Sequence, residues 1–193
     1  MIKKLLFLFF LSILTACSVN GGISKYETPN FKEEGVLLLP VEDRALFFAT
    51  GVLFTLVDSN GVKTVLRVND WEEPINPSEG HGKKYFGAFS LPEGNYKLTA
   101  WRLIYTEGKP AKEPSEPLTF SINKGEVIYI GNFNAIRPIG NGQFRDKYSE
   151  DSKKFRSLYS WLTDRNIKKE LVKSSWWSLP DGIDPKDLTK NSK

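Results

Sequence analysis

The sequence predicts a mainly β protein, an antiparallel β-sandwich of about seven strands followed by a short C-terminal helical segment. Between residues 35 and 135 the chain is a series of short apolar or alternating runs, each separated from the next by turn residues. After about Gly142 the apolar residues recur with the period of an α-helix instead. With 193 residues, 40% of them hydrophobic, the chain is long enough to form one core-bearing domain.

Seven runs have the length of strands and are rich in β-branched and aromatic residues. They span residues 35–41, 52–57, 62–68, 85–90, 96–105, 118–122 and 127–135. Asn60-Gly61 separates the second run from the third, and Pro92-Glu93-Gly94 separates the fourth from the fifth; such residues adopt the backbone angles of tight turns. The run from Tyr96 has apolar residues on both faces, which is typical of a central strand.

The remaining segments are predicted to be loops, one helix and a tail. Residues 69–84 and 106–117 are rich in proline, glycine and glutamate, and the first of them is long enough for a lid or binding loop. An apolar helical stripe consists of Phe155, Leu158, Tyr159 and Leu162. Residues 149–152, Ser-Glu-Asp-Ser, supply caps and acids for the helix start. The end of the tail that begins at Ser174 is predicted to be disordered.

The first sixteen residues have the layout of a secretory signal. Lys3 and Lys4 precede an apolar run that starts at Leu5 and is interrupted by one serine. The run has about 10 to 12 apolar residues, whereas a membrane-spanning helix needs roughly 20. The segment is therefore predicted to direct export, and not to anchor the protein by spanning a membrane.

The signal ends in Leu14-Thr15-Ala16-Cys17, which resembles the bacterial lipobox, where small residues precede a cysteine that receives a diacylglycerol. Because Cys17 is the only cysteine, a disulfide framework is excluded, and we expect lipidation there. Two or three acyl chains hold membrane lipid firmly, at about 0.8 kcal/mol per buried methylene. The alternatives are an ordinary signal peptide with a chance cysteine near its end, and a buried hydrophobic cysteine. Since Ser18 and not aspartate follows the acceptor, the resemblance implies a lipid-anchored protein of the cell envelope, at the outer membrane.

These predictions divide the chain into four parts. They are a signal peptide at 1–16, a lipidated N-terminus and flexible tether at 17–33, a β-sandwich domain at 34–140, and a C-terminal helix with a partly disordered tail at 141–193. Removing the signal deletes two lysines, which lowers the formal net charge from +4 to +2. Nothing in this charge suggests a nucleic-acid partner.

Three stretches resemble small bacterial lipoprotein families of unknown function that carry an Ig-like or transthyretin-like sandwich. They are residues 91–98, with a proline, a glycine and then Tyr-Lys-Leu, residues 124–132, with Gly-Glu-Val-Ile-Tyr-Ile-Gly, and residues 146–162, with an acid-capped helix. The resemblance covers about half of the mature chain and implies a sandwich fold. It implies no catalytic residue, because such families have no established activity.

A search for catalytic chemistry finds isolated residues only. A Ser-His-Asp triad would have to use His81, the only histidine, and the chain has no Gly-x-Ser-x-Gly motif. Asp58 and Asn60 begin a calcium-loop pattern that lacks its distal glutamate. Glu72 and Glu73 are adjacent in a loop, so their side chains are expected to point apart. We therefore predict a protein that is not an enzyme and that uses no cofactor and no metal.

Tryptophan is the more informative residue type. Trp71 in the long loop and Trp176 and Trp177 in the tail form a candidate binding surface, because tryptophan suits sugar stacking and protein interfaces. The competing interpretation places Trp101 and Trp161 in the core and folds the tail pair over an open edge of the sandwich.

The predicted function is that of a membrane-anchored envelope lipoprotein acting as a binding or structural module. Its partners would be membrane lipid, through acylated Cys17, and an envelope protein or glycan. One alternative is a hydrolase of cell-wall or surface glycans that uses Glu72 and Glu73. Another is an accessory lipoprotein of a secretion or surface-appendage complex.

Overall fold

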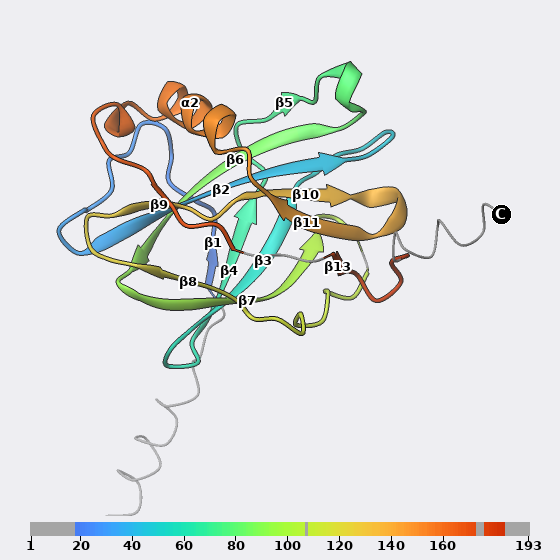
Figure 1. The fold of residues 1–193 in the computed structure, drawn as a ribbon, viewed down its shortest axis with the longest axis horizontal. Coiled ribbons are helices and arrows are strands. Elements are labelled where there is room, and N and C mark those ends of the chain that lie inside the picture. Colours follow the sequence, from blue (N-terminus) through green and yellow to red (C-terminus); the bar gives the residue numbers. More distant parts are fainter. Residues whose placement is uncertain (1–17, 107, 173–175, 184–193) are drawn as a thin grey trace, which may run out of the picture.

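The computed structural model describes residues 18–106, 108–172 and 176–183, and is mainly β, with two sheets and one α-helix (Figure 1). The first sheet contains, in spatial order, β1 (Ser18–Asn20), β4 (Lys63–Val68), β3 (Val52–Asp58), β7 (Gly94–Leu103) and β8 (Leu118–Ile122). The second sheet contains β2 (Glu34–Arg44), β5 (Glu73–Pro74), β6 (Lys83–Pro92), β9 (Val127–Tyr129), β10 (Asn132–Ile136), β11 (Asn141–Arg145), β12 (Lys168–Lys169) and β13 (Trp177–Ser178). The helix is α2 (Tyr148–Leu158), and single 3-10 turns form η1 (Pro77–Glu79), η2 (Arg137–Ile139) and η3 (Ser160–Leu162).

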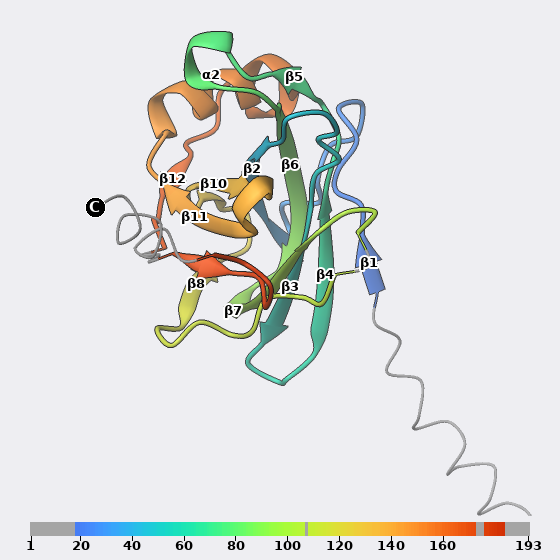
Figure 2. The same ribbon diagram turned by 90° about the vertical axis from the view of Figure 1, so that its right-hand side faces the viewer.

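The elements form three layers, with the second sheet in the middle (Figures 1 and 2). The first sheet packs on one face of it, and α2 and η3 cover the other. Strand β2 contributes to both cores, because alternate side chains point to opposite faces. Leu37 and Leu39 enter the core between the sheets, and Val36 and Leu38 enter the core beneath the helix. All four are fully buried, so β2 is the central strand of the molecule.

Parallel pairing departs from the predicted antiparallel sandwich. Antiparallel β6 occupies one edge of β2, and β9 and β10 pair in parallel with the other edge, one after the other. Strands β1 and β4 are also parallel, as are β9 and β12. Parallel neighbours need a long crossover, and here all strands of the first sheet after β1 lie between β2 and β9 in sequence. The mainly β class is confirmed; the purely antiparallel pairing is wrong.

The predicted strand at 127–135 is two strands, β9 and β10. Gly131, between them, has a φ of +121°, a conformation that other residues rarely adopt. The break lets β9 pair with the start of β2 and β10 with its end. The helical stripe is also divided, because α2 ends at Leu158 and η3 follows it.

The segment predicted to be a flexible tether is packed on the domain from Ser18 onward. Its first residues form β1, which pairs with β4. Ile23 is buried, and its N–H donates to the carbonyl of Ala88 at 2.7 Å. The small polar residues predict a tether, but backbone hydrogen bonds and the packing of Ile23 and Phe31 against the core beneath α2 hold the segment on the domain.

The predicted boundary at residue 140 is likewise misplaced, because the hairpin of β10 and β11 crosses it. Two further short strands, β12 and β13, belong to the second sheet and come from the segment predicted to be helix and tail. The predicted disordered end at 184–193 lies outside the described residues. Within the part of the chain that the structure describes, no helix is both long and apolar enough to span a membrane.

Candidate functional site

Strand β2 ends in two adjacent carboxylates, Glu42 and Asp43, that are fully buried. Their side chains lie on opposite faces of the second sheet, Glu42 toward α2 and Asp43 toward the first sheet. A buried carboxylate without a partner costs several kcal/mol, so the groups that each one binds decide its role. Those groups come from β2 itself, from the loop that follows it, and from elements far away in the sequence.

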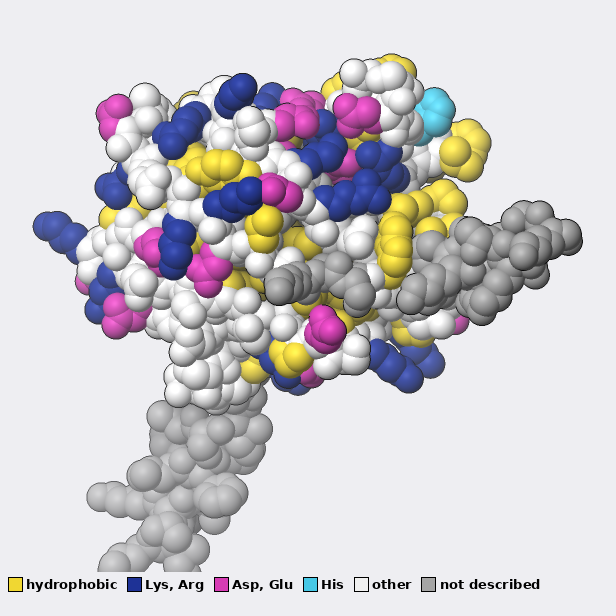
Figure 3. Space-filling model, viewed as in Figure 1, with side chains coloured by type: hydrophobic (Ala, Val, Ile, Leu, Met, Phe, Trp, Pro, Cys, Tyr) yellow, Lys and Arg dark blue, Asp and Glu magenta, His cyan; other side chains and the backbone are white. Residues whose placement is uncertain are grey.

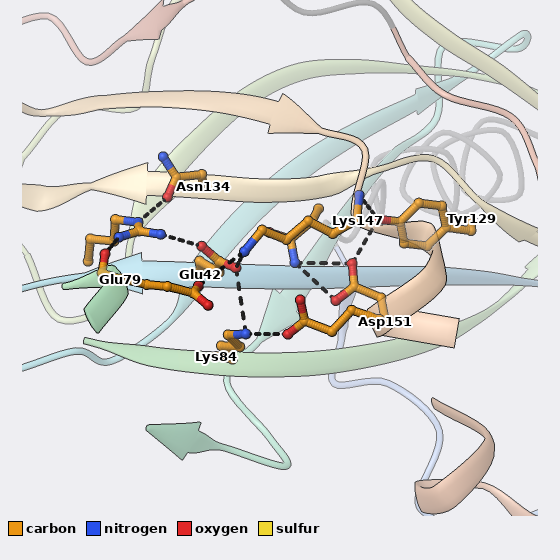
Figure 4. Close-up of polar contacts among 10 residues, drawn as sticks. Glu42, Glu79, Lys84, Tyr129, Asn134, Lys147 and Asp151 are labelled. Atoms are coloured by element: carbon orange, nitrogen blue, oxygen red, sulfur yellow. Dashed lines mark hydrogen bonds and ion pairs between the residues drawn. The ribbon is translucent and has the colours of Figure 1, made fainter. Parts of the chain in front are cut away.

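Glu42 is surrounded by three cations (Figure 4). Its Oε1 lies 2.5 Å from Nζ of Lys147 and 3.9 Å from Nζ of Lys84, and its Oε2 lies 2.8 Å from the guanidinium of Arg44. Burial by itself raises the pKa of Glu42, but the hydrogen bonds and charges of Lys147 and Arg44 outweigh it and hold the pKa below its ordinary value. Glu42 is therefore ionised at neutral pH and acts as an acceptor of hydrogen bonds.

The same cations reach further elements. Lys84, on β6, lies 2.5 Å from Glu150 of α2, and although burial lowers its pKa, Glu150 and Glu42 raise it above its ordinary value. Arg44 donates to the Glu79 carbonyl in η1 and, at 2.6 Å, to Oδ1 of Asn134 in β10. The cluster around Glu42 thus ties β2 to β6, β10, η1 and α2.

A second buried carboxylate, Asp151, lies beside this cluster in the first turn of α2. Its Oδ2 accepts from the hydroxyl of Tyr129 at 2.7 Å and from the amide of Asn132 at 3.2 Å (Figure 4). Burial raises the pKa of Asp151 to about 6, although the hydrogen bonds from Tyr129 and Asn132 favour its ionised form. In the described part of the chain Oδ1 of Asn132, itself buried, has no hydrogen-bond partner. The group fastens α2 to the second sheet.

Asp43 holds the loop that follows β2, which we call the aromatic loop (residues 45–51). Arg137 of η2 binds both carboxylate oxygens, at 2.9 and 2.6 Å. The backbone N–H groups of Thr50 and Gly51 donate to Oδ2 at 2.8 and 2.9 Å. Arg137 also donates to the Thr50 hydroxyl, which donates to the carbonyl of Ile104. The C-terminal end of the loop is therefore fixed to both sheets.

The tip of the aromatic loop projects into solvent. Leu46, Phe47 and Phe48 are 66%, 87% and 82% exposed. Burying one such side chain is worth about 1.5–3 kcal/mol, and these three forgo that gain. Figure 3 shows hydrophobic side chains projecting at the right-hand end of the molecule, beside the single histidine. A contiguous exposed apolar group of this kind marks an interaction site more often than isolated surface residues do.

Tyr105 emerges at the same end of the sandwich. It follows Ile104, whose N–H donates to the Gly51 carbonyl at 3.1 Å. The Tyr105 ring is 81% exposed, and its hydroxyl accepts from Arg67 at 3.1 Å. Its φ of +57° is unfavourable for a bulky residue, and such strain is common at functional sites. The aromatic loop and Tyr105 together form the candidate functional site.

The structure separates the tryptophans of the predicted binding surface. Trp177 is buried in the core between the sheets, where its carbonyl accepts from the indole of Trp101 at 3.0 Å. Its own indole donates to the Lys112 carbonyl at 2.7 Å, so Trp177 is a core residue and its assignment to a binding surface is wrong. Trp176 is half-buried. Trp71 is half-buried against the core beneath α2, with Nζ of Lys25 at 4.7 Å from its ring.

The other candidate residues lie apart from this site or outside the described part. Cys17 lies outside the described residues. His81 is exposed in the loop after η1. Glu72 pairs with Lys83 at 2.7 Å and Glu73 with Lys154 at 2.6 Å, so the two carboxylates are bound to different cations.

The pattern at 58–61 forms the turn that the sequence predicts. Oδ1 of Asp58 accepts from the N–H groups of Asn60 and Val62, both at 2.8 Å. Gly61 has a φ of +79°, as a tight turn requires. Among the described residues no group of three or more His, Cys, Asp or Glu side chains could hold a metal ion.

An open groove of about 420 Å³ lies at the other end of the sandwich, between the β3–β4 turn, β7 and β8. Its polar groups already bind one another, because the Ser121 hydroxyl donates to Asn95 at 2.7 Å and the Ser121 N–H donates to Glu170 at 3.3 Å. The groove therefore presents few unused groups to a ligand.

Sequence reasoning missed both the buried carboxylates and the aromatic loop. Three charged residues after Val41 indicate the end of a strand, and the burial of Glu42 and Asp43 depends on Lys147 and Arg137, about a hundred positions later. One signal was present, however. Ala45-Leu46-Phe47-Phe48-Ala49 is an apolar run between three charged residues and Thr50-Gly51, and it lies outside the predicted strands, which is unusual for a loop.

Comparisons with known proteins do not identify this chain. No family model matches the sequence, and no curated protein matches it. Among solved structures, a leucine-rich repeat protein from Bacteroides thetaiotaomicron aligns with 65% of this chain at 15% identity and a TM-score of 0.32. The alignment spans 16% of that protein's length, and a similarity this distant carries no information about function.

Proposed function

We propose that this chain is a lipid-anchored protein of the bacterial cell envelope, at the outer membrane, and that its sandwich is a binding module. The observation that carries the proposal is the sequence Leu14-Thr15-Ala16-Cys17 at the end of a short apolar segment. Acyl chains on Cys17 would hold the protein at a bilayer without a spanning helix.

The start of the domain supports a close attachment to the bilayer. Because β1 begins at Ser18, the residue after Cys17, no free linker separates the anchor from the first sheet. Ser18 lies opposite Thr64, near the turn between β3 and β4 (Figure 1). The anchor would therefore join the domain at the end that carries this turn.

The polar interior supports a binding role. The buried carboxylates Glu42 and Asp43 are paired with cations and hold loops in place. One of these loops is the aromatic loop, and the side chains that it exposes to solvent, Leu46, Phe47 and Phe48, are apolar. Apolar groups on a fixed loop supply contact area for a partner and no acid or base for a reaction.

Membrane fractionation of a Cys17→Ala variant of the full chain tests the anchor. The parent protein should remain in the membrane pellet after a high-salt wash, and the variant should leave it, because no acyl chain can attach. A Ser18→Ala variant is the matched control and should fractionate with the parent. If Cys17→Ala stays in the pellet to the same extent as the parent, the proposal is wrong.

A further inference from the structure

The tip of the aromatic loop has no role in the domain's own core. Leu46, Phe47 and Phe48 are mostly exposed, whereas the neighbouring Ala45 is buried. Apolar side chains that contribute nothing to folding but lie next to each other are the usual anchors of an interface.

The loop is also held in a fixed position before anything binds. Asp43 accepts from two of its N–H groups and from Arg137, and the Tyr85 hydroxyl donates to the carbonyl of Ala49 at 2.8 Å. Fixing a loop in advance reduces the entropy that binding must remove. The ion pair between Asp43 and Arg137 therefore helps to fix the loop that exposes Leu46, Phe47 and Phe48.

The position of the tip excludes the bilayer that holds the anchor, if the proposed lipidation is correct. Strand β1 runs parallel to β4 from the β3–β4 turn, with Ser18 opposite Thr64. The aromatic loop joins the first sheet at the opposite end of β4, where Val52 pairs with Val68 (Figure 1). An anchor attached directly to β1 leaves the tip pointing away from its own membrane.

The first sheet carries positive charge beside the C-terminal end of the aromatic loop, where Leu53 is paired with both Arg67 and Arg102. The charged residues nearest this end in β4 and β7 are Arg67 and Arg102. Arg102 is exposed, and Arg67 is half-buried and lies 5.9 Å from the Tyr105 ring centre. A partner with carboxylates around its binding pocket would complement the positive charges of Arg67 and Arg102.

From these observations we infer that the aromatic loop, with Tyr105, is the docking surface for a protein partner that has an apolar pocket with an acidic rim. Leu46, Phe47 and Phe48 enter the pocket, and Arg67 and Arg102 face the rim. The inference rests on the proposed function, because it uses the anchor to exclude the nearer membrane.

Site-specific photocrosslinking in intact cells tests the surface. Benzoylphenylalanine replaces Phe47 in the full chain, and Tyr26, also an aromatic residue with 87% exposure, is the matched control position. We expect a protein adduct from position 47 that position 26 does not give. Adducts to lipid alone, adducts to a second copy alone, or no adduct would each overturn the inference.

Affinity measurements then decide whether the adduct reports this surface. The partner is identified by mass spectrometry, purified and titrated with the full-length lipidated chain in detergent. Joint Phe47→Ser and Phe48→Ser changes should weaken binding about tenfold or more, as should joint Arg67→Glu and Arg102→Glu changes. Tyr26→Ser should leave the affinity unchanged, and an unaltered affinity in the serine variant would refute the docking surface.

The two proposals can fail separately. A specific adduct at position 47 in a chain whose Cys17 carries no lipid would refute the lipid anchor. It would also refute the claim that the tip points away from an anchoring membrane, but it would leave the docking surface in place. Normal lipidation with no adduct at position 47 would remove the docking surface alone.

Discussion

At the scale of single residues, the molecule contains two kinds of buried carboxylate. Glu42 lies among three cations and has a lowered pKa, whereas Asp151, within the described ranges, accepts side-chain hydrogen bonds from the neutral donors Tyr129 and Asn132 and has a pKa raised to about 6. The difference follows from the partners, because both side chains are almost fully buried. Glu42 stabilises the fold when it is ionised, and Asp151 stabilises it most when it is protonated.

The stability of the protein should therefore respond to mild acid through Asp151. Its ordinary pKa of 3.8 applies to the unfolded chain, so between about pH 4 and pH 6 the folded state holds more protons. The free energy of unfolding should fall by about 2–3 kcal/mol as the pH rises through this range, and should then stay level with respect to this group.

Urea unfolding of Asp151→Asn across this pH range measures the effect. The variant should lose that part of the pH dependence, whereas Asp146→Asn, at an exposed carboxyl with a lowered pKa, should keep it. An unchanged slope in Asp151→Asn would show that another group titrates.

The contacts of Asp43 with Arg137, Thr50 and Gly51 give a second prediction at this scale. Asp43→Asn leaves the Arg137 guanidinium facing a neutral amide, which should cost about 3 kcal/mol of folding stability. Hydrogen exchange of the Thr50 and Gly51 amides should also accelerate, because both donate to the lost carboxylate. Phe47→Ser, at an exposed tip, should change stability by less than about 0.5 kcal/mol. Protected amides in Asp43→Asn would mean that the loop is held by other contacts.

At the scale of elements, the tail that follows Ser174 contributes to folding stability through Trp177 in β13. Trp177 packs in the core between the sheets and lies 6.3 Å from the Phe133 ring centre. Trp177→Ala should therefore cost about 3–5 kcal/mol in the free energy of unfolding, as the removal of a buried aromatic side chain does. Chemical denaturation measures this, and a cost below about 1 kcal/mol would place Trp177 at the surface instead.

The elements that the sequence predicts well are those with a local signal. The turns at Asn60-Gly61 and Pro92-Glu93-Gly94 lie where the composition places them, and six of the seven runs correspond to one strand each. Pairing partners have no such signal, because β2 pairs with β9 and β10, and these strands are separated from it in the sequence by β3, β4, β7 and β8 of the first sheet. The tether predicted at 17–33 is wrong from Ser18 onward for the same reason, since β1 bonds to β4 through the backbone, and Ile23 and Phe31 pack against the core beneath α2.

The candidate site was predictable only in part. Burial of Glu42 and Asp43 could not be predicted, because adjacent charged residues after a strand are solvated unless distant cations reach them. The tryptophans were a reasonable choice by residue type, yet a large aromatic side chain packs in a core as readily as it binds a partner. The sequence alone does not show that Phe47 and Phe48 are exposed, because phenylalanine is usually a core residue.

At the scale of the whole molecule, the proposed lipid anchor and the proposed docking surface belong to opposite ends of the first sheet. The lipid would attach beside the β3–β4 turn, and the aromatic loop would present its apolar tip at the other end. Strand β4 runs from one of these ends to the other. If both proposals hold, the domain would present its binding surface on the side that faces away from its membrane.

Everything in this arrangement depends on the acylation of Cys17, and intact-mass analysis of the protein extracted from membranes measures it directly. We predict a mature chain that begins at Cys17 and carries a thioether-linked diacylglycerol, with a mass that exceeds that of residues 17–193 by the attached lipid. A chain that retains residues 1–16, or one with an unmodified Cys17 sulfur, would contradict the account.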